Sequence, residues 1–185
     1  AVIAEGEVLQ LATAHDLTTD LGRYEQVIRG KTAALFAAAA EVGGVIAGAE
    51  ERQVEALRTY GDALGIAFQI ADDWLDYGGD AGTLGKNTGD DFREGKVTMP
   101  VIKAMQAADD EARAFWQRTI GRGKHETGDL DRAMAYLVET GALEATRHAA
   151  RTEADRAIAA LDAFPPGPLA TALADVAEYV VSREA

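Results

Sequence analysis

Three aspartates, Asp72, Asp73 and Asp76, stand within the stretch FQIADDWLDY, residues 68–77. In a helix, side chains at this spacing share one face, where like charges repel one another. No lysine or arginine lies within four residues of them to relieve the repulsion. A compensating cation is therefore expected, and carboxylate oxygens are the ligands that select Mg²⁺ or Ca²⁺.

Mg²⁺ usually takes only one or two protein carboxylates and completes its shell with water and substrate phosphate. The aspartates therefore predict a Mg²⁺ that bridges Asp72 and Asp76 to a phosphorylated ligand, with Asp73 in support. Gln69 falls on the same stripe of the helix. The alternative is an ordinary solvated face of an amphipathic helix. The position of the aspartates at the helix C-terminus, where the dipole disfavours negative charge, counts against that alternative.

Four cationic or hydroxyl residues are candidates to act with the aspartates. Lys86 and Lys96 lie in the glycine-rich stretch GKNTGDDFREGK, which lacks the spacing of a Walker loop but could clamp a diphosphate. Lys31 and Thr32 open the otherwise apolar run KTAALFAAAA. Two simpler roles stay open, because the lysine could extend to solvent and the threonine could bond back to its own helix.

The apolar spacing indicates that helices position these residues. It shows no strand alternation and predicts an all-α fold of moderately long, antiparallel helices. The residues around the aspartates form one long helix, and the glycine-rich segment 78–96 reads as a loop. The helices are expected over 1–14, 24–40, 51–77, 98–120, 129–139, 141–163 and 169–182.

Composition excludes several classes of function. The net charge of −13 disfavours nucleic-acid binding, which needs a basic surface. No apolar run reaches the roughly 18 residues of a membrane span, and no signal peptide is visible, so a cytoplasmic location is expected. The chain has no cysteine and hence no disulfide framework. His15, His125 and His148 stand in polar surroundings and are expected at the surface.

These stretches together resemble the trans-prenyltransferases, or polyprenyl diphosphate synthases. The resemblance runs along the whole chain in the family's order, through GEVLQL (6–11), KTAALFAAAA, FQIADDWLD, LGKNTGDDFREGKVTMP and YVVSREA. It implies an isoprenoid-synthase-type helical bundle around a central cavity, usually as a homodimer. It also implies a Mg²⁺-dependent enzyme that joins isopentenyl diphosphate to an allylic diphosphate, head to tail.

The resemblance assigns roles to individual residues. Asp72 would hold one Mg²⁺, with Asp73 and Asp76 assisting directly or through water. Thr32 and Gln69 would point oxygen atoms at the allylic carbocation. The leaving diphosphate itself would take the proton that completes the new double bond.

The remaining assignments concern the substrate and the cavity wall. Lys31, Lys86 and Lys96 would bind the substrate diphosphate. Glu7 and Gln10 would face the cavity as its polar active-site positions.

The family also carries a first aspartate-rich motif, which would bind the other two of its three Mg²⁺, and this motif is absent here. Residues 1–185 are therefore expected to form the C-terminal portion of a single all-α synthase domain, and to be inactive alone. The amino-acid sequence from Leu75 to Pro100 resembles that of bacterial long-chain synthases. This resemblance predicts a C40–C50 product for a quinone side chain.

Four alternatives stay open. One is a shorter-chain farnesyl or geranylgeranyl diphosphate synthase. A second is a non-catalytic subunit of a heteromeric prenyltransferase, although such subunits typically lose the aspartate motifs. A third is a class I terpene cyclase, against which the lysine–glycine loop after DDWLD argues. The last is a purely structural helical module, which would bind no diphosphate.

Overall fold

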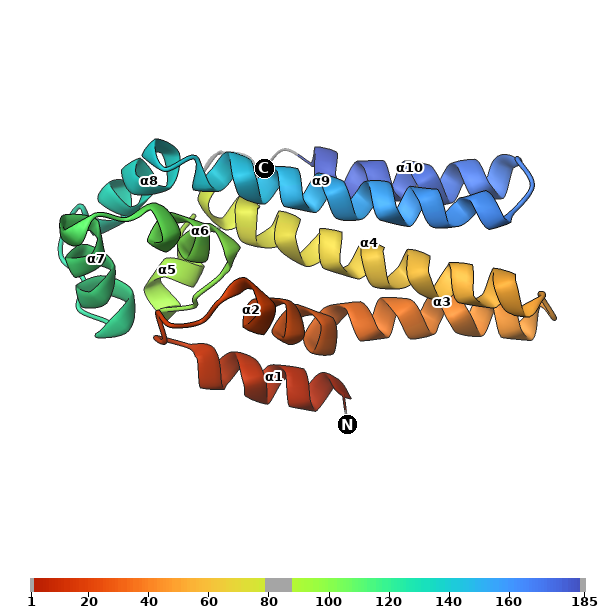
Figure 1. Cartoon of the computed structure of the whole chain (residues 1–185), viewed down its shortest axis with the longest axis horizontal. Coiled ribbons are helices and arrows are strands. Elements are labelled where there is room, and N and C mark those ends of the chain that lie inside the picture. The colour runs from red at the N-terminus through yellow and green to blue at the C-terminus, as the bar shows by residue number, and fades with distance from the viewer. Residues whose placement is uncertain (1, 79–87, 184–185) are drawn as a thin grey trace.

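The computed structural model describes residues 2–78 and 88–183 and shows a helical protein (Figure 1). Within these two ranges there is no β-strand, which confirms the all-α prediction. None of the helices in the described ranges is long and apolar enough to serve as a membrane span.

The central element is α4 (Glu51–Gly78), the long helix predicted around the aspartates. Its neighbours α3 (Ala34–Ile46) and α9 (Ala142–Ala160) run alongside it, and α10 (Pro168–Ser182) covers α9 and α4 (Figure 1). Glycines allow the close approach of α3 to α4. A Cβ atom added at Gly61 would lie 2.4 Å from the carbonyl oxygen of Phe36. Because α4 is packed on several sides, even parts of its polar stripe are buried.

The helix predicted over 24–40 is divided into three segments, α2 (Leu21–Ile28), η1 (Arg29–Ala33) and α3. The η1 segment is π-helical, since the backbone N–H of Ala34 reaches the carbonyl of Arg29, five residues back. Asp20 caps α2 by accepting a hydrogen bond from the Arg23 backbone N–H at 2.8 Å. Helix α1 (Val2–Thr13) packs against η1.

The second part of the chain closes one end of the bundle. The elements at this end are α5 (Asp90–Glu94), α6 (Met99–Ala107), α7 (Asp110–Trp116), the π-helical η2 (Gln117–Gly121) and α8 (Asp129–Glu139). Helix α9 then runs back along α4, and the 3₁₀ turn η3 (Leu161–Ala163) follows it at the far end (Figure 1). The prediction of one helix over 98–120 was wrong. Ala108 is extended, and the Asp109 carboxylate caps α7 by accepting from the Ala112 N–H at 2.8 Å. Helix α5 lies in the stretch that was predicted to be a loop.

An ion pair between Asp129 and Arg118 ties α8 to η2. Asp129 is 7% exposed and accepts hydrogen bonds from both terminal nitrogens of Arg118 at 2.7 Å and from the Glu126 backbone N–H at 2.7 Å. The Arg118 hydrogen bonds, followed by that from Glu126, lower the pKa of Asp129 to about 2 although burial opposes them.

Asp129→Asn is expected to lower the thermal unfolding midpoint at pH 7. Because the folded-state pKa of Asp129 lies below its ordinary value of 3.8, its stabilising effect is fully present above about pH 4 and is lost as the pH falls towards 2. Thermal melts of both proteins between pH 7 and pH 3 check this. The gap between the two midpoints should narrow at low pH, and a gap that stays constant would contradict the assignment.

Candidate active site

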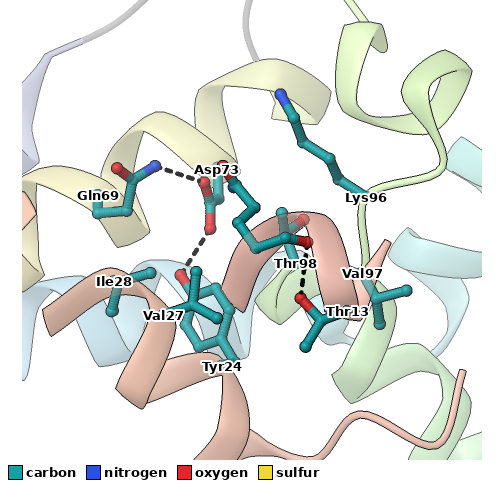
Figure 2. Close-up of a pocket in the computed structure, with 10 residues that line it drawn as sticks. Thr13, Tyr24, Val27, Ile28, Gln69, Asp73, Lys96, Val97 and Thr98 are labelled. Atoms are coloured by element: carbon teal, nitrogen blue, oxygen red, sulfur yellow. Dashed lines mark hydrogen bonds between the residues drawn. The ribbon is translucent and has the colours of Figure 1, made fainter. Parts of the chain in front are cut away.

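The acidic stripe is the face of α4 that carries Gln69, Asp72, Asp73 and Asp76. A chain of hydrogen bonds connects η1, α4 and α2 at this stripe. Thr32 Oγ1 donates to Gln69 Oε1 at 2.9 Å, and Gln69 Nε2 donates to Asp73 Oδ1 at 2.9 Å. The Tyr24 hydroxyl donates to Asp73 Oδ2 at 2.6 Å, so the two oxygens of Asp73 each accept a hydrogen bond (Figure 2). This part of the stripe therefore faces the protein interior. Asp62, further back on α4, instead pairs with Arg29 and Arg156.

The η1 segment also packs against α1, which lies on the side opposite α4 (Figure 1). Lys31 Nζ donates to Gln10 Oε1 at 3.0 Å and lies 4.0 Å from Glu7 Oε1. Lys31 and Thr32 both belong to the π-helical segment, and single π-helical turns within helices are frequent at functional sites. The two neighbouring residues therefore reach different elements: Lys31 reaches α1 and Thr32 reaches α4.

Burial shapes the charge state of Asp73 and its neighbours. Asp73 is 4% exposed, and burial, followed by the nearby Asp91 carboxylate, raises its pKa to about 7 despite the hydrogen bonds from Tyr24 and Gln69. Burial, followed by the charge of Asp73, also holds the pKa of the Tyr24 hydroxyl well above its ordinary value. Tyr24 therefore stays protonated and remains a hydrogen-bond donor at neutral pH.

Asp76 and Asp91 form the second half of the acidic cluster. Asp76 accepts from the backbone N–H groups of Asp90 and Asp91 at 3.1 and 3.0 Å, which anchors the start of α5 to the end of α4. Burial and the Asp91 charge raise the pKa of Asp76 to about 6. Lys96 Nζ binds Glu94 at 2.7 Å and Asp91 at 2.9 Å. Burial acts to lower the pKa of Lys96, but these two contacts outweigh it and raise that pKa.

Asp72 differs from the other two aspartates. It is partly exposed, and within residues 2–78 and 88–183 its carboxylate takes part in no hydrogen bond or ion pair. No group of three or more histidine, aspartate or glutamate side chains in those ranges is already gathered around a metal-sized space. A Mg²⁺ that takes one carboxylate directly and completes its shell with water and substrate phosphate does not need such a group. The donor set therefore fits that kind of site, with Asp72 as the available ligand.

A small cavity of about 20 Å³ lies beside this network, large enough for about one water molecule. Its lining includes Gln10, Tyr24, Gln69, Asp73, Lys96 and Thr98, which come from both parts of the chain (Figure 2). Lys96 therefore borders the same cavity as Asp73, and its ammonium group binds Asp91 and Glu94, so its contact with a diphosphate stays a prediction.

The structure brings most of the predicted site residues into one region. Glu7, Gln10 and Lys31 meet in one contact, and Thr32, Gln69 and Asp73 in another. Lys86 lies outside the described residues. The three histidines are exposed, as expected. Sequence reasoning missed two further residues.

The missed residues are Tyr24 and Asp91, which contact Asp73 and Lys96 respectively. Asp91 stands in the quoted acidic stretch GDDFREGK, so its charge was a usable signal. Tyr24 offered none, because its contact with Asp73 joins residues 49 positions apart and depends on how α2 faces α4.

Comparison with known proteins agrees with the family resemblance of the sequence. The sequence model of the family described as polyprenyl synthetase matches residues 1–137. The octaprenyl diphosphate synthase of Escherichia coli (strain K12) is 43% identical over 185 residues, which cover 99% of this chain and 56% of that protein. The chain thus spans little more than half the length of this relative.

Two solved structures are also similar. A decaprenyl diphosphate synthase from Rhodobacter capsulatus is 61% identical with a TM-score of 0.92, and the match covers 97% of this chain and 55% of that one. A polyprenyl synthase from Caulobacter crescentus CB15, complexed with calcium and isoprenyl diphosphate, is 50% identical with a TM-score of 0.94. That match covers 100% of this chain and 56% of the other.

Proposed function

Because the chain belongs to the polyprenyl synthetase family, we propose that the native protein containing these 185 residues is a polyprenyl diphosphate synthase. It would condense isopentenyl diphosphate with an allylic diphosphate, head to tail. The observation that carries the proposal is the hydrogen-bonded connection from Thr32 through Gln69 to Asp73, with Lys31 adjacent to Thr32. Lys31 joins this region through its hydrogen bond to Gln10, which lines the same cavity as Gln69 and Asp73.

The reaction begins when the allylic C–O bond breaks, which leaves a carbocation and a diphosphate anion. Lys31, Lys86 and Lys96 are proposed to hold the diphosphate end of the substrate through charge-assisted hydrogen bonds. Asp72, supported by Asp73 and Asp76, would hold Mg²⁺, which when bound stabilises the leaving anion. Three Mg²⁺ are proposed for the native protein, one of them on these aspartates.

The side-chain oxygens of Thr32 and Gln69 are proposed to stabilise the carbocation by fixed dipoles. The isopentenyl double bond then forms the new C–C bond with the allylic cation. Loss of one proton restores a double bond, and the departed diphosphate is proposed to accept that proton. Glu7 and Gln10 orient Lys31, because both approach its ammonium group from α1.

The three relatives described above support a divalent cation and a long product. The Caulobacter crescentus protein was solved with calcium and isoprenyl diphosphate, and the names of the other two relatives specify octaprenyl and decaprenyl products. We therefore propose a C40–C50 product, suited to a quinone side chain. A cytoplasmic homodimer is proposed with it, and the exposed Val8 and Leu11 on α1 offer an apolar surface for a subunit contact.

The test is incorporation of radiolabelled isopentenyl diphosphate by the native protein with Mg²⁺ and allylic primers of increasing length. The expected result is primer-dependent incorporation that stops when Mg²⁺ is chelated, with C40–C50 chains on chromatography. Products of C15 or C20 would replace the long-chain assignment with a shorter-chain synthase. No incorporation by the native protein alone, but activity with a second co-purifying prenyltransferase chain, would identify a non-catalytic subunit.

A further inference from the structure

Tyr24 is buried, at 4% exposed, and its only polar side-chain atom is directed at the acidic stripe. The hydroxyl donates to Asp73 Oδ2 at 2.6 Å across the contact between α2 and α4 (Figure 2). Tyr24 and Asp73 also line the same small cavity. A hydroxyl buried in this way needs a partner, and Asp73 provides it.

The hydrogen bond from Tyr24 has consequences beyond Asp73. With Oδ2 held by Tyr24, Oδ1 of Asp73 accepts from Gln69 Nε2. The Gln69 amide is thereby oriented, because its nitrogen faces Asp73 while its oxygen accepts from Thr32 Oγ1. An amide turned the other way would place the Gln69 carbonyl oxygen against the Asp73 carboxylate, so that two acceptors would face each other.

The π-helical η1 segment aligns the two ends of this chain. Tyr24 and Thr32 are eight residues apart, and in an uninterrupted α-helix they would differ in direction by about 80°. One residue inserted as a π-turn reduces this difference to about 20°. Their partners Asp73 and Gln69 are four residues apart on α4 and differ by about 40°. The insertion therefore lets Tyr24 and Thr32 face the same side of α4.

We propose that Tyr24 is a positioning residue that fixes the Asp73 carboxylate and, through it, the Gln69 amide. This inference rests on the proposed function, because it concerns the metal and diphosphate site of that reaction. Tyr24 touches neither substrate nor metal in this scheme. It acts by removing the freedom of Asp73 to rotate, so that the carboxylate is already oriented before Mg²⁺ and diphosphate bind.

Tyr24→Phe removes the hydroxyl and keeps the ring. The measurement is calorimetric binding of an unreactive allylic thiolodiphosphate to the native protein over a series of Mg²⁺ concentrations. The Mg²⁺ concentration for half-maximal binding is expected to rise about 10–100-fold, the usual effect of disturbing an outer-shell group of a metal site, because Asp73 supports the Mg²⁺ on Asp72. At position 24, p-aminophenylalanine restores an N–H donor and is expected to recover most of the loss.

Tyr60→Phe is the matched control. Tyr60 is 3% exposed on α4, and its hydroxyl donates to the Leu173 carbonyl at 2.8 Å, away from the acidic stripe. The Tyr60→Phe protein also loses one buried hydrogen bond, and its Mg²⁺ requirement should not change. A second control uses Asp73→Asn: if Tyr24 acts through Asp73, adding Tyr24→Phe to that variant should change the Mg²⁺ requirement by less than about 2-fold.

Three results would overturn the positioning role. One is a Tyr24→Phe protein with the wild-type Mg²⁺ requirement. Another is a Tyr24→Phe/Asp73→Asn double variant whose Mg²⁺ requirement rises by the full product of the two single-variant increases. The third is a Tyr24→Phe protein that unfolds while Tyr60→Phe folds, since the hydroxyl would then be a structural anchor. A wild-type protein without any Mg²⁺-dependent binding would instead refute the proposed function, and the inference with it.

Discussion

Replacing Asp72 by alanine is expected to lower kcat/KM for condensation by at least about 100-fold, the scale on which a catalytic electrostatic group acts. Asp72 is the aspartate whose carboxylate has no partner within the described residues, and its neighbours Asp73 and Asp76 are already engaged by donors. Without it, the proposed Mg²⁺ loses its direct protein ligand. Steady-state kinetics at saturating Mg²⁺ measure the effect.

Asp62→Ala is the control for this prediction. Asp62 lies on the same helix, but its carboxylate binds Arg29 and Arg156, each at 2.7 Å. Its loss is expected to change thermal stability while kcat/KM stays within a few-fold of wild type. If both variants lost activity equally, or if Asp72→Ala kept wild-type activity, Asp72 would not be the ligand.

Gly6→Ala is expected to have a large effect, because the added methyl group would meet backbone atoms of η1. A Cβ atom at Gly6 would lie 2.3 Å from the backbone nitrogen of Lys31 and 2.6 Å from the carbonyl carbon of Gly30. Backbone atoms cannot rotate away, so α1 must move off η1, and Gln10 must separate from Lys31. Overpacking of this kind costs about 1–3 kcal/mol or more.

Two measurements check the Gly6→Ala prediction. The thermal midpoint should fall by about 2–4 °C for each kcal/mol lost. The KM for the allylic diphosphate should rise, because Lys31 loses the contact that orients it.

Gly43→Ala is the matched control, since a Cβ atom there meets nothing within 4 Å in the described structure. Alanine is the better helix former, so the midpoint of Gly43→Ala should stay the same or rise. Equal effects at both glycines would contradict the close contact of α1 with η1.

The helical elements were largely predictable, because apolar spacing and capping residues act locally. The helix expected over 51–77 is α4, Glu51–Gly78, and the helix expected over 129–139 has those bounds. The helix expected over 98–120 was divided because Asp109 caps α7 with its own carboxylate. An aspartate that interrupts apolar residues at helical spacing can stay within the helix and point to solvent, or it can cap a new helix. The packing of the surrounding helices decides which of the two occurs.

The candidate site was predictable where charge and resemblance marked it, and not where packing alone decided. Lys31, Thr32 and Gln69 stood out by type and position. The π-helical segment did not, because Gly30 in RGKTA lowers helix propensity but does not indicate that one extra residue is inserted into the turn. Its effect is a rotation of the following residues, and that rotation decides whether Tyr24 and Thr32 face α4 together. A contact that depends on such a rotation cannot be predicted from the spacing of residue types along the sequence.

The most direct test is a crystal structure of the native protein with Mn²⁺ and an unreactive allylic thiolodiphosphate, using anomalous scattering to locate the metal. The central claim predicts a metal peak about 2.0–2.2 Å from an Asp72 carboxylate oxygen, bridged to diphosphate oxygens, with Lys31 binding the same diphosphate. Metal and diphosphate bound elsewhere, with the Asp72 carboxylate left in solvent, would contradict it.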